Sequence, residues 1–521
     1  MKKLLFLLIL ASFSFGSLLP ITSAQNNSSE SLGTSPKLVV GIVIDQMRYD
    51  YLTRFWVHYG EGGFKRLVNG GFTCKNTHYN YAPTSTGPGH ASIYTGTTPS
   101  THGIIGNSWF DKASSSIVYC ASDNLYTSIG TDMDTGQMSP HWMTVSTITD
   151  ELRLFTQKKG KVIALALKDR GAVLPGGHMA NAAYWYNGGL EGDWISSSYY
   201  MEELPKWVRD FNKSNASEKY KKSWDTLKDI KTYVESGTDD NMYEGLFGGE
   251  VAPVFPHDLP SIWEANSQFN ILKATPYGNS ITADFALAAL DGEALGKDDI
   301  TDFLAISFSS TDYVGHQFGV NSKEIQDTYL RLDQDLERLL KALDKKVGAG
   351  EYVVFLTSDH GAVDVPAYLR DQKIPAGYMD SKGMSAKFTE FMSFNYGDAK
   401  LVRNFSNASF FLDHKVIRNL DLKVEEVQHA IAQELLSYDG ISRVFTGHQL
   451  VQNEYTKGIP YIMQNGHNQK RSGDVMLVLD PSVVYYPDTG STHGSPYVYD
   501  THVPLLFYGK GILKGSTIER T

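Results

Sequence analysis

Short runs of apolar, often β-branched residues recur along the chain, and each is followed by a turn and then by helical patterning. Such runs are typical of strands that are buried on both faces, as in a largely parallel sheet with helices on either side. We therefore predict an α/β fold with a mostly parallel central sheet flanked by helices. The runs are residues 38–44, 161–167, 303–308, 352–357, 475–479 and 504–507.

The clearest helical pattern covers about residues 324–346. Its apolar residues recur at steps of three and four, and Gly348 follows as a terminator. Because this helix lies between the runs at 303–308 and 352–357, the three segments predict a strand–helix–strand crossover unit.

Two segments break this rhythm, at about 175–280 and 365–470. Both look irregular, apart from an amphipathic helix near residues 424–436 in the second. We interpret them as insertions that form a cap or rim on a single α/β domain covering residues 36–521. Insertions at the rim of such a sheet often shape the access of a substrate.

The N-terminus has the pattern of a cleavable secretory signal peptide at residues 1–24. A charged start is followed by apolar residues 4–10 and by a small-residue cleavage site at 22–24. The apolar core is too short to span a bilayer. Residues 25–35, rich in Asn and Ser, are expected to be flexible. No cysteine precedes Cys74, so we expect no lipid anchor at the cleavage site and a periplasmic or secreted protein.

The charge balance is acidic. Removing residues 1–24 takes away two lysines and no acids, which moves the formal charge from −11 to −13. This excludes general nucleic-acid binding by a basic surface, but not an anionic substrate, because a bound metal can dominate the local field. Two cysteines, Cys74 and Cys120, could pair in an oxidising compartment, and the sequence leaves that open.

Charged and imidazole side chains follow four of the predicted strands, and a further histidine follows a fifth. In a doubly wound sheet, ligands bind beyond the carboxyl ends of the strands, so these side chains are expected to meet at one edge. They are Asp45, Lys168, Arg170, Asp312, His316, Asp359, His360 and His493.

The spacing of these residues indicates specific roles. Asp312 and His316 are four residues apart, so one helical turn directs both toward a shared ion. Lys168 and Arg170 are two apart at a strand end, where they point the same way while Asp169 points opposite. Paired cations suit a dianionic group. The three carboxylates and three imidazoles make two sets of N and O ligands, the composition of open catalytic zinc sites.

A loop rich in hydroxyls precedes a short predicted helix. Thr84, Ser85 and Thr86 lie just before Pro88, which suits a first helical turn. A hydroxyl there projects from a helix N-terminus that favours an anion, although an ordinary N-cap gives the same pattern. The residues alone do not choose among the three hydroxyls, and Asn107 taken alone is more often a turn residue.

At these positions the chain resembles the alkaline phosphatase superfamily, and most of all its phosphate-irrepressible PafA type with a threonine nucleophile. The resemblance runs through most of the chain. Its motifs are residues 43–50, 99–107, 168–172, 312–316, 357–361 and 491–494.

The resemblance implies a secreted alkaline phosphatase that acts on phosphate monoesters through a phosphothreonine on Thr86 and releases inorganic phosphate. It implies two zinc ions. One would be held by Asp312, His316 and His493, and the other by Asp45, Asp359, His360 and Thr86. Asn107, Lys168 and Arg170 would contact the phosphoryl oxygens. Gly87 departs from the family pattern, where a residue with a side chain is expected.

Three other classes compete with this interpretation. A phosphodiesterase or nucleotide pyrophosphatase of the same superfamily shares the ligands and the threonine, but Lys168 and Arg170 favour the extra charged oxygen of a monoester. A catalytically inactive secreted binding protein could use the aromatic segment at 175–280. A sulfatase is disfavoured because the C/S-x-P-x-R sequence is absent. We expect a monomer that binds small phosphomonoesters and phosphate, and neither nucleic acid nor membrane.

Overall fold

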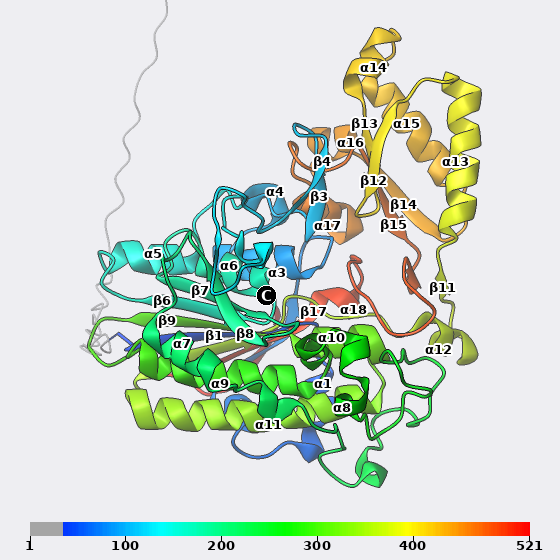
Figure 1. Ribbon diagram of the computed structural model, residues 1–521. Coiled ribbons are helices and arrows are strands. Elements are labelled where there is room, and N and C mark those ends of the chain that lie inside the picture. The colour runs from blue at the N-terminus through cyan, green and yellow to red at the C-terminus, as the bar shows by residue number, and fades with distance from the viewer. Residues whose placement is uncertain (1–34) are drawn as a thin grey trace, which may run out of the picture. The chain divides into compact units, whose positions relative to one another are not determined.

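A ten-stranded mixed sheet forms the centre of the computed structural model, which describes residues 35–521 (Figure 1). The predicted signal peptide and nearly all of the predicted flexible N-terminus lie outside the described residues. Five parallel strands make the middle of the sheet. In spatial order they are β10 (Tyr352–Thr357), β1 (Leu38–Ile44), β9 (Asp302–Phe308), β6 (Val162–Ala166) and β7 (Ala182–Asn187).

Antiparallel pairings extend both edges of this parallel centre. Beyond β7 lie β8 (Asp193–Ser197) and β5 (Ser128–Ile129). Beyond β10 lie β17 (His502–Gly509), β2 (Phe72–His78) and β18 (Gly515–Arg520), of which β18 runs parallel to β2. The predicted α/β class, a central sheet flanked by helices, is confirmed, and the sheet is mixed, with a parallel centre and mainly antiparallel pairings beyond it.

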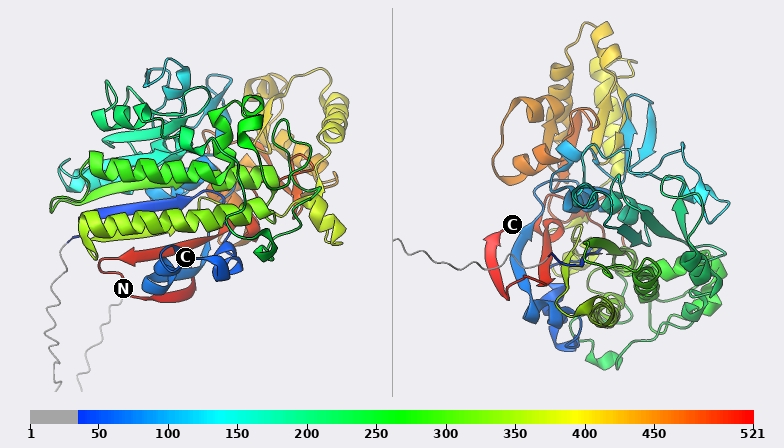
Figure 2. Two further views of the ribbon diagram at one scale, coloured as in Figure 1. Left: turned by 60° about the horizontal axis from the view of Figure 1, so that its bottom comes forward. Right: turned by 90° about the vertical axis from the view of Figure 1, so that its left-hand side faces the viewer.

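Both faces of the sheet are covered, which explains the continuous apolar runs. Leu38, Val40 and Ile42 of β1 pack into one core cluster, whereas Val43 packs into another. Successive side chains of a strand point to opposite faces. The first cluster is closed by α9 (Pro276–Gly292) and α11 (Lys323–Leu343), and the second by α3 (Thr86–Thr95) and α6 (Asp169–Gly176) (Figures 1 and 2).

Two of the predicted strands are present, but neither is a parallel strand of the central sheet. The run at 504–507 falls in β17, which is antiparallel to β10. The run at 475–479 is β15 (Val475–Leu479), and it belongs to a separate four-stranded antiparallel sheet. An apolar run reports burial on both faces and carries no information about the direction of its neighbours, so these two assignments to the parallel sheet were wrong.

The four-stranded sheet lies mostly within the 365–470 segment. Its order is β12 (Val402–Ser406), β13 (Ser409–Leu412), β15 and β14 (Ile441–Thr446). Helices α13 (Ser381–Tyr396) and α15 (Val424–Leu435) share one hydrophobic cluster with it. The predicted helix near 424–436 is therefore present. The run at 475–479 predicted β15, but the edge strand β12 escaped the sequence analysis because its alternating, partly exposed residues form no apolar run.

The structure also answers the question about the two cysteines. Cys74 lies in β2, and Cys120 directly follows β4 (Ser116–Tyr119), which pairs with β3 (Ser108–Asp111) in a separate two-stranded sheet. Both thiols are buried and free, so no disulfide joins them. None of the helices in residues 35–521 combines the length and the apolar character needed to cross a membrane.

The 175–280 segment is tied to α11 by a buried histidine. In His257, Nδ1 lies 2.7 Å from Glu250 Oε1 and Nε2 lies 3.2 Å from Glu324 Oε1. Burial alone lowers the pKa of this imidazole, but the two carboxylates outweigh burial and raise the pKa to about 9. The histidine is therefore charged in the folded protein at neutral pH and holds two segments together.

The charge on His257 makes the fold less stable in alkali. Because the folded pKa lies above the unfolded value, the contribution of His257 is fully present below pH 6.5 and is lost as the pH rises through about 9. We expect it to be about 3 kcal/mol. Thermal melting between pH 6 and pH 10 should show a falling Tm, and His257→Gln should flatten that slope. A slope unchanged by His257→Gln would contradict this assignment.

Candidate active site

The strand ends bring the predicted metal ligands together at one edge of the sheet. Asp45 follows β1, and Asp359 and His360 follow β10. Asp312 and His316 lie in α10 (Ser310–Phe318), the helix after β9, as their spacing predicted. His493 comes from the loop before α18 (Val498–Thr501).

Two groups of three residues have ligand atoms within 4.8 Å of one another. The first group is Asp312, His316 and His493, and the second is Asp45, Asp312 and His360. The first agrees with the predicted set. In the second, Asp312 takes the place expected for Asp359, whose Oδ2 nevertheless lies 3.6 Å from His360 Nε2.

The distances between ligand atoms fit a shared ion. From Asp312 Oδ1 to His316 Nε2 is 3.2 Å, and from the same oxygen to His493 Nε2 is 3.6 Å. His360 Nε2 lies 3.5 Å from Asp45 Oδ1. Ligands about 2 Å from one metal ion stand at this kind of separation from each other.

Backbone carbonyl groups orient the three imidazoles. Nδ1 of His316 lies 2.7 Å from the carbonyl oxygen of Ser491, Nδ1 of His493 lies 2.7 Å from that of Thr84, and Nδ1 of His360 lies 2.9 Å from that of Gly361. Each Nδ1 therefore carries the proton, and each Nε2 keeps its lone pair for a ligand. Burial lowers the pKa of His360 and His493, which keeps these rings neutral.

The donor atoms that face the centre of the cluster fit a metal. Asp45 Oδ1, Asp359 Oδ2 and His360 Nε2 are buried and have no hydrogen-bond partner. Burial raises the pKa of Asp45, and the carboxylates of Asp312 and Asp359, which place negative charge beside it, raise it further. Divalent cations relieve both the unpaired lone pairs and that charge. The residues present therefore fit a metal centre.

Lys168 lies among these carboxylates at the end of β6. Its Nζ is 2.6 Å from Asp45 Oδ2, 2.6 Å from Asp312 Oδ2 and 3.4 Å from Thr86 Oγ1. Burial opposes the charge on Lys168, but Asp312 and Asp45 outweigh burial and raise the pKa of its ammonium group. A permanent cation therefore lies next to the Thr86 hydroxyl.

The three hydroxyls of the loop differ in their surroundings. Thr84 Oγ1 donates to the carbonyl oxygen of Ser495. Ser85 occupies the N-cap position of α3, but its buried Oγ makes no capping hydrogen bond and has no partner. Thr86 is the first residue of α3, is 1% exposed, and is the hydroxyl near Lys168. Of the three, only the Thr86 hydroxyl combines a place at the helix N-terminus with a position beside Lys168 and the metal-ligand cluster.

Asn107 and Gly87 form a small unit next to Thr86. Asn107 Oδ1 accepts a hydrogen bond from Gly87 N at 2.7 Å, which leaves the Asn107 amide group free to donate to a ligand. A Cβ at Gly87 would stand 3.2 Å from both Asn107 Oδ1 and Cys120 Sγ. The absence of a side chain at Gly87 therefore leaves space for Asn107. The hydrogen bond from the Gly87 amide to Asn107 fixes this turn, so no side chain is needed at position 87 to do so.

Arg170 is positioned differently from the prediction. The helix α6 begins at Asp169, so Asp169 and Arg170 lie in a helical turn rather than in a strand. Arg170 Nη1 donates to the Tyr119 hydroxyl at 3.1 Å, and this hydroxyl in turn donates to Asp169 Oδ1. The expectation that Asp169 points away from Arg170 was wrong, because both side chains share Tyr119.

Sequence reasoning missed two residues that hold ligands in place. Gln46 Nε2 donates to Asp312 Oδ1 at 2.7 Å, and Gln46 N donates to Asp359 Oδ1 at 3.1 Å. Its φ of 61° is unusual for a non-glycine residue. The buried His90 lies 3.3 Å from Asp359 Oδ2 and 2.9 Å from the carbonyl oxygen of Thr86. Gln46 directly follows the predicted ligand Asp45, and His90 follows the loop that contains Thr86. Neither belongs to an apolar pattern of strand or helix, so the sequence did not indicate a role for them.

Comparison with known proteins identifies the family. The family described as type I phosphodiesterase / nucleotide pyrophosphatase matches residues 39–502. The chain belongs to this family. It is 45% identical to the alkaline phosphatase PhoV of Synechococcus elongatus, over 92% of this chain and 87% of that protein. It is 42% identical to the alkaline phosphatase PafA of Elizabethkingia meningoseptica, over 92% and 88%.

The similarity between this chain and PafA extends to the fold. The crystal structure of wild-type alkaline phosphatase PafA matches with a TM-score of 0.89 at 42% identity, over 93% of each chain. The chain therefore has the alkaline phosphatase-like fold and belongs to the alkaline phosphatase superfamily, in its PafA and PhoV type. It is also 45% identical to a protein of Myroides odoratus named calcium-transporting ATPase, over 95% of this chain and 90% of that protein.

Proposed function

We propose that this protein is a zinc-dependent alkaline phosphatase, which hydrolyses phosphate monoesters through a phosphothreonine on Thr86 and releases inorganic phosphate. The observation that carries the proposal is the position of the Thr86 hydroxyl. It begins a helix, it lies 3.4 Å from the Lys168 ammonium group, and that group contacts Asp45 and Asp312. The names of the PhoV and PafA relatives support the same activity.

We propose two zinc ions as the cofactor. Asp312, His316 and His493 would hold one ion, and Asp45, Asp359 and His360, with Thr86, would hold the other. The unpartnered Asp45 Oδ1, Asp359 Oδ2 and His360 Nε2 support this assignment. When bound, such ions supply Lewis-acid stabilisation of the attacking and leaving oxygens of a phosphoryl transfer.

The protein groups then act as follows. Lys168, Arg170 and the Asn107 amide bind the non-bridging oxygens of the dianionic phosphate and hold it in line with Thr86. Thr86 Oγ1 loses its proton to solvent and attacks phosphorus, while the bond from phosphorus to the alcohol oxygen breaks and the alcohol leaves with a proton taken from solvent. Water then attacks the phosphothreonine, which restores the threonine hydroxyl and releases phosphate. The amide groups at the start of α3 favour the anion during both steps.

Two neighbouring activities compete with the proposal. The family name includes phosphodiesterases, and the Myroides relative is named an ATPase. The terminal phosphate of ATP has the same dianionic group as a monoester, so ATP hydrolysis uses the same residues. A diester lacks one charged oxygen, and two cations beside it serve an ester group poorly. The pair Lys168 and Arg170 therefore favours monoesters over diesters.

Changing both cations to alanine tests this choice. In Lys168→Ala/Arg170→Ala we expect kcat/KM for p-nitrophenyl phosphate to fall by roughly 10³-fold or more, because donors aimed at the transferred group are lost. For bis(p-nitrophenyl) phosphate we expect a loss of less than about tenfold. Equal losses on the two substrates would count against the monoesterase.

A matched control keeps the result interpretable. Arg66 forms a two-point ion pair with Asp344, with Nη1 and Nη2 each 2.8 Å from a carboxylate oxygen, and belongs to no site described above. Arg66→Ala should change the Tm and leave both activities at the wild-type ratio. We further propose that the protein acts in the periplasm or outside the cell, which the signal-like residues 1–24 support.

A further inference from the structure

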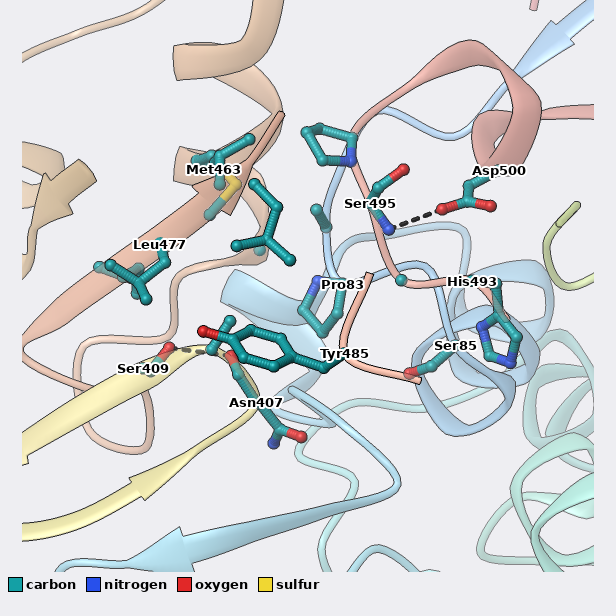
Figure 3. Close-up of a pocket in the computed structure, with 18 of the residues that line it drawn as sticks. Pro83, Ser85, Asn407, Ser409, Met463, Leu477, Tyr485, His493, Ser495 and Asp500 are labelled. Atoms are coloured by element: carbon teal, nitrogen blue, oxygen red, sulfur yellow. Dashed lines mark hydrogen bonds between the residues drawn. The ribbon is translucent and has the colours of Figure 1, made fainter. Parts of the chain in front are cut away.

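A largely apolar pocket of about 490 Å³ begins at the candidate active site. Ser85, Asn107 and His493 line it, and each is next to or part of the catalytic cluster. In Figure 3, Ser85 and His493 lie on one side of the pocket, and Met463 and Leu477 lie on the opposite side. The pocket therefore joins the phosphoryl site to the four-stranded sheet.

The wall of the pocket is built by a hydrophobic cluster outside the main core. Met463 of α17 (Gly458–Gly466) packs there with Met476 and Val478 of β15, and all three line the pocket. Phe405 and Val484 extend the apolar lining. These side chains take no part in the phosphate chemistry described above. Because they line a pocket next to the phosphoryl site, they favour an apolar ligand there.

The side chains that would bind the phosphate lie below the surface. Asp45 is fully buried, Thr86 is 1% exposed, and Lys168 is 4% exposed. The pocket lined by Ser85, Asn107 and His493 gives the organic group of a bound ester a place next to these buried side chains. The buried Ser85 Oγ, which has no hydrogen-bond partner, offers a donor to an ester oxygen at the mouth of the pocket.

We infer that this pocket binds the organic group of the substrate, and that the preferred substrates are monoesters with a neutral apolar alkyl or aryl group. The inference rests on the proposed phosphatase function and specifies its substrate class. When the apolar group binds in the pocket, its surface is removed from water while the phosphate reaches Thr86. Because a longer apolar group buries more surface, kcat/KM should rise with its length.

The charges around the pocket disfavour anionic organic groups. Across the described chain, neither lysine nor arginine contributes to its lining, whereas Asp480 and Asp500 do. A nucleoside diphosphate or a carboxylate-bearing group therefore finds acids and no cation to pair with. We therefore expect this site to prefer apolar monoesters to ATP.

A series of n-alkyl phosphates from methyl to hexyl tests the inference. Their alcohols leave with nearly equal ease, so differences report contacts of the alkyl group. We expect kcat/KM to rise by up to about fourfold per methylene, the effect of burying one such group. The carboxylate-bearing 6-phosphohexanoate should react more slowly than hexyl phosphate. A flat series, or equal rates for these two substrates, would overturn the inference.

Two variants separate the pocket from general destabilisation. Met463→Ala and Leu450→Ala remove the same number of non-hydrogen atoms from the same hydrophobic cluster, but Leu450 does not line the pocket. Met463→Ala should lower kcat/KM for hexyl phosphate roughly tenfold and leave methyl phosphate unchanged. Leu450→Ala should leave both unchanged. Equal responses of the two variants would contradict the inference.

Calorimetric binding of hexylphosphonate and methylphosphonate gives a readout independent of turnover. We expect hexylphosphonate to bind wild type more tightly, and Met463→Ala to abolish most of that difference. If methyl phosphate is not hydrolysed at all, the proposed phosphatase function fails. If methyl phosphate is hydrolysed normally and chain length has no effect on rate or binding, the pocket inference alone fails.

Discussion

Thr86→Ala is expected to lower kcat/KM for p-nitrophenyl phosphate by roughly 10⁴- to 10⁶-fold, the scale on which loss of a catalytic nucleophile acts in hydrolases. The physical reason is that no other described hydroxyl combines the helix N-terminus with the Lys168 ammonium group. Steady-state kinetics measure the loss. Acid quenching with labelled phosphate should trap a phosphoenzyme in wild type and none in Thr86→Ala.

The neighbouring hydroxyls provide matched controls for this prediction. Thr84 Oγ1 is engaged with the Ser495 carbonyl oxygen, and Ser85 Oγ has no partner. Thr84→Val and Ser85→Ala should therefore keep activity within about tenfold of wild type, the scale of one hydrogen bond. If Ser85→Ala lost activity as Thr86→Ala does, or if Thr86→Ala kept a trapped phosphoenzyme, the nucleophile would be misassigned.

Removal of metal is expected to be nearly as damaging. Dialysis against a strong chelator should reduce activity by at least about 10³-fold, because metal ions stabilise transition-state charge by several kcal/mol. Added zinc should restore the activity, and elemental analysis should find two zinc ions per chain. The Tm of the metal-free protein should be lower, because a ligand that binds only the folded state stabilises it.

Two histidine variants sharpen the metal experiment. His493→Ala should lower the zinc content by one ion, because His493 belongs to the group with Asp312 and His316. His414 also faces a carboxylate, with Nε2 2.6 Å from Asp474 Oδ1, but it lies next to the four-stranded sheet and outside the metal-ligand cluster. His414→Ala should keep two zinc ions and full activity. Full activity of the chelated protein would contradict the proposed cofactor.

Much of the fold and of the site geometry could be predicted from sequence because both depend on strand ends. The run at 38–44 gave β1 with the same limits, and Asp45 therefore falls at the sheet edge. Asp312 and His316 occupy one helical turn, as their spacing indicated. In a parallel sheet, chain direction alone determines where such residues meet.

The rest depended on contacts that leave no periodic trace in the sequence. Gln46 reaches Asp312 only because its backbone adopts a positive φ. Tyr119 joins Arg170 to Asp169 across fifty positions of the chain. The assignment of Asp359 and the choice among three neighbouring hydroxyls likewise needed the family resemblance or the coordinates. Tertiary packing decides such contacts, and local pattern does not.

The three imidazoles held by main-chain carbonyl groups have a consequence for how the protein matures. Their rotation is already restricted by the loops that contain Thr84, Gly361 and Ser491, so capture of an ion needs little rearrangement. Uptake should therefore be rapid once folding is complete. By the same token, a substitution that shifts one of these loops by a fraction of an ångström alters ion affinity without touching any ligand.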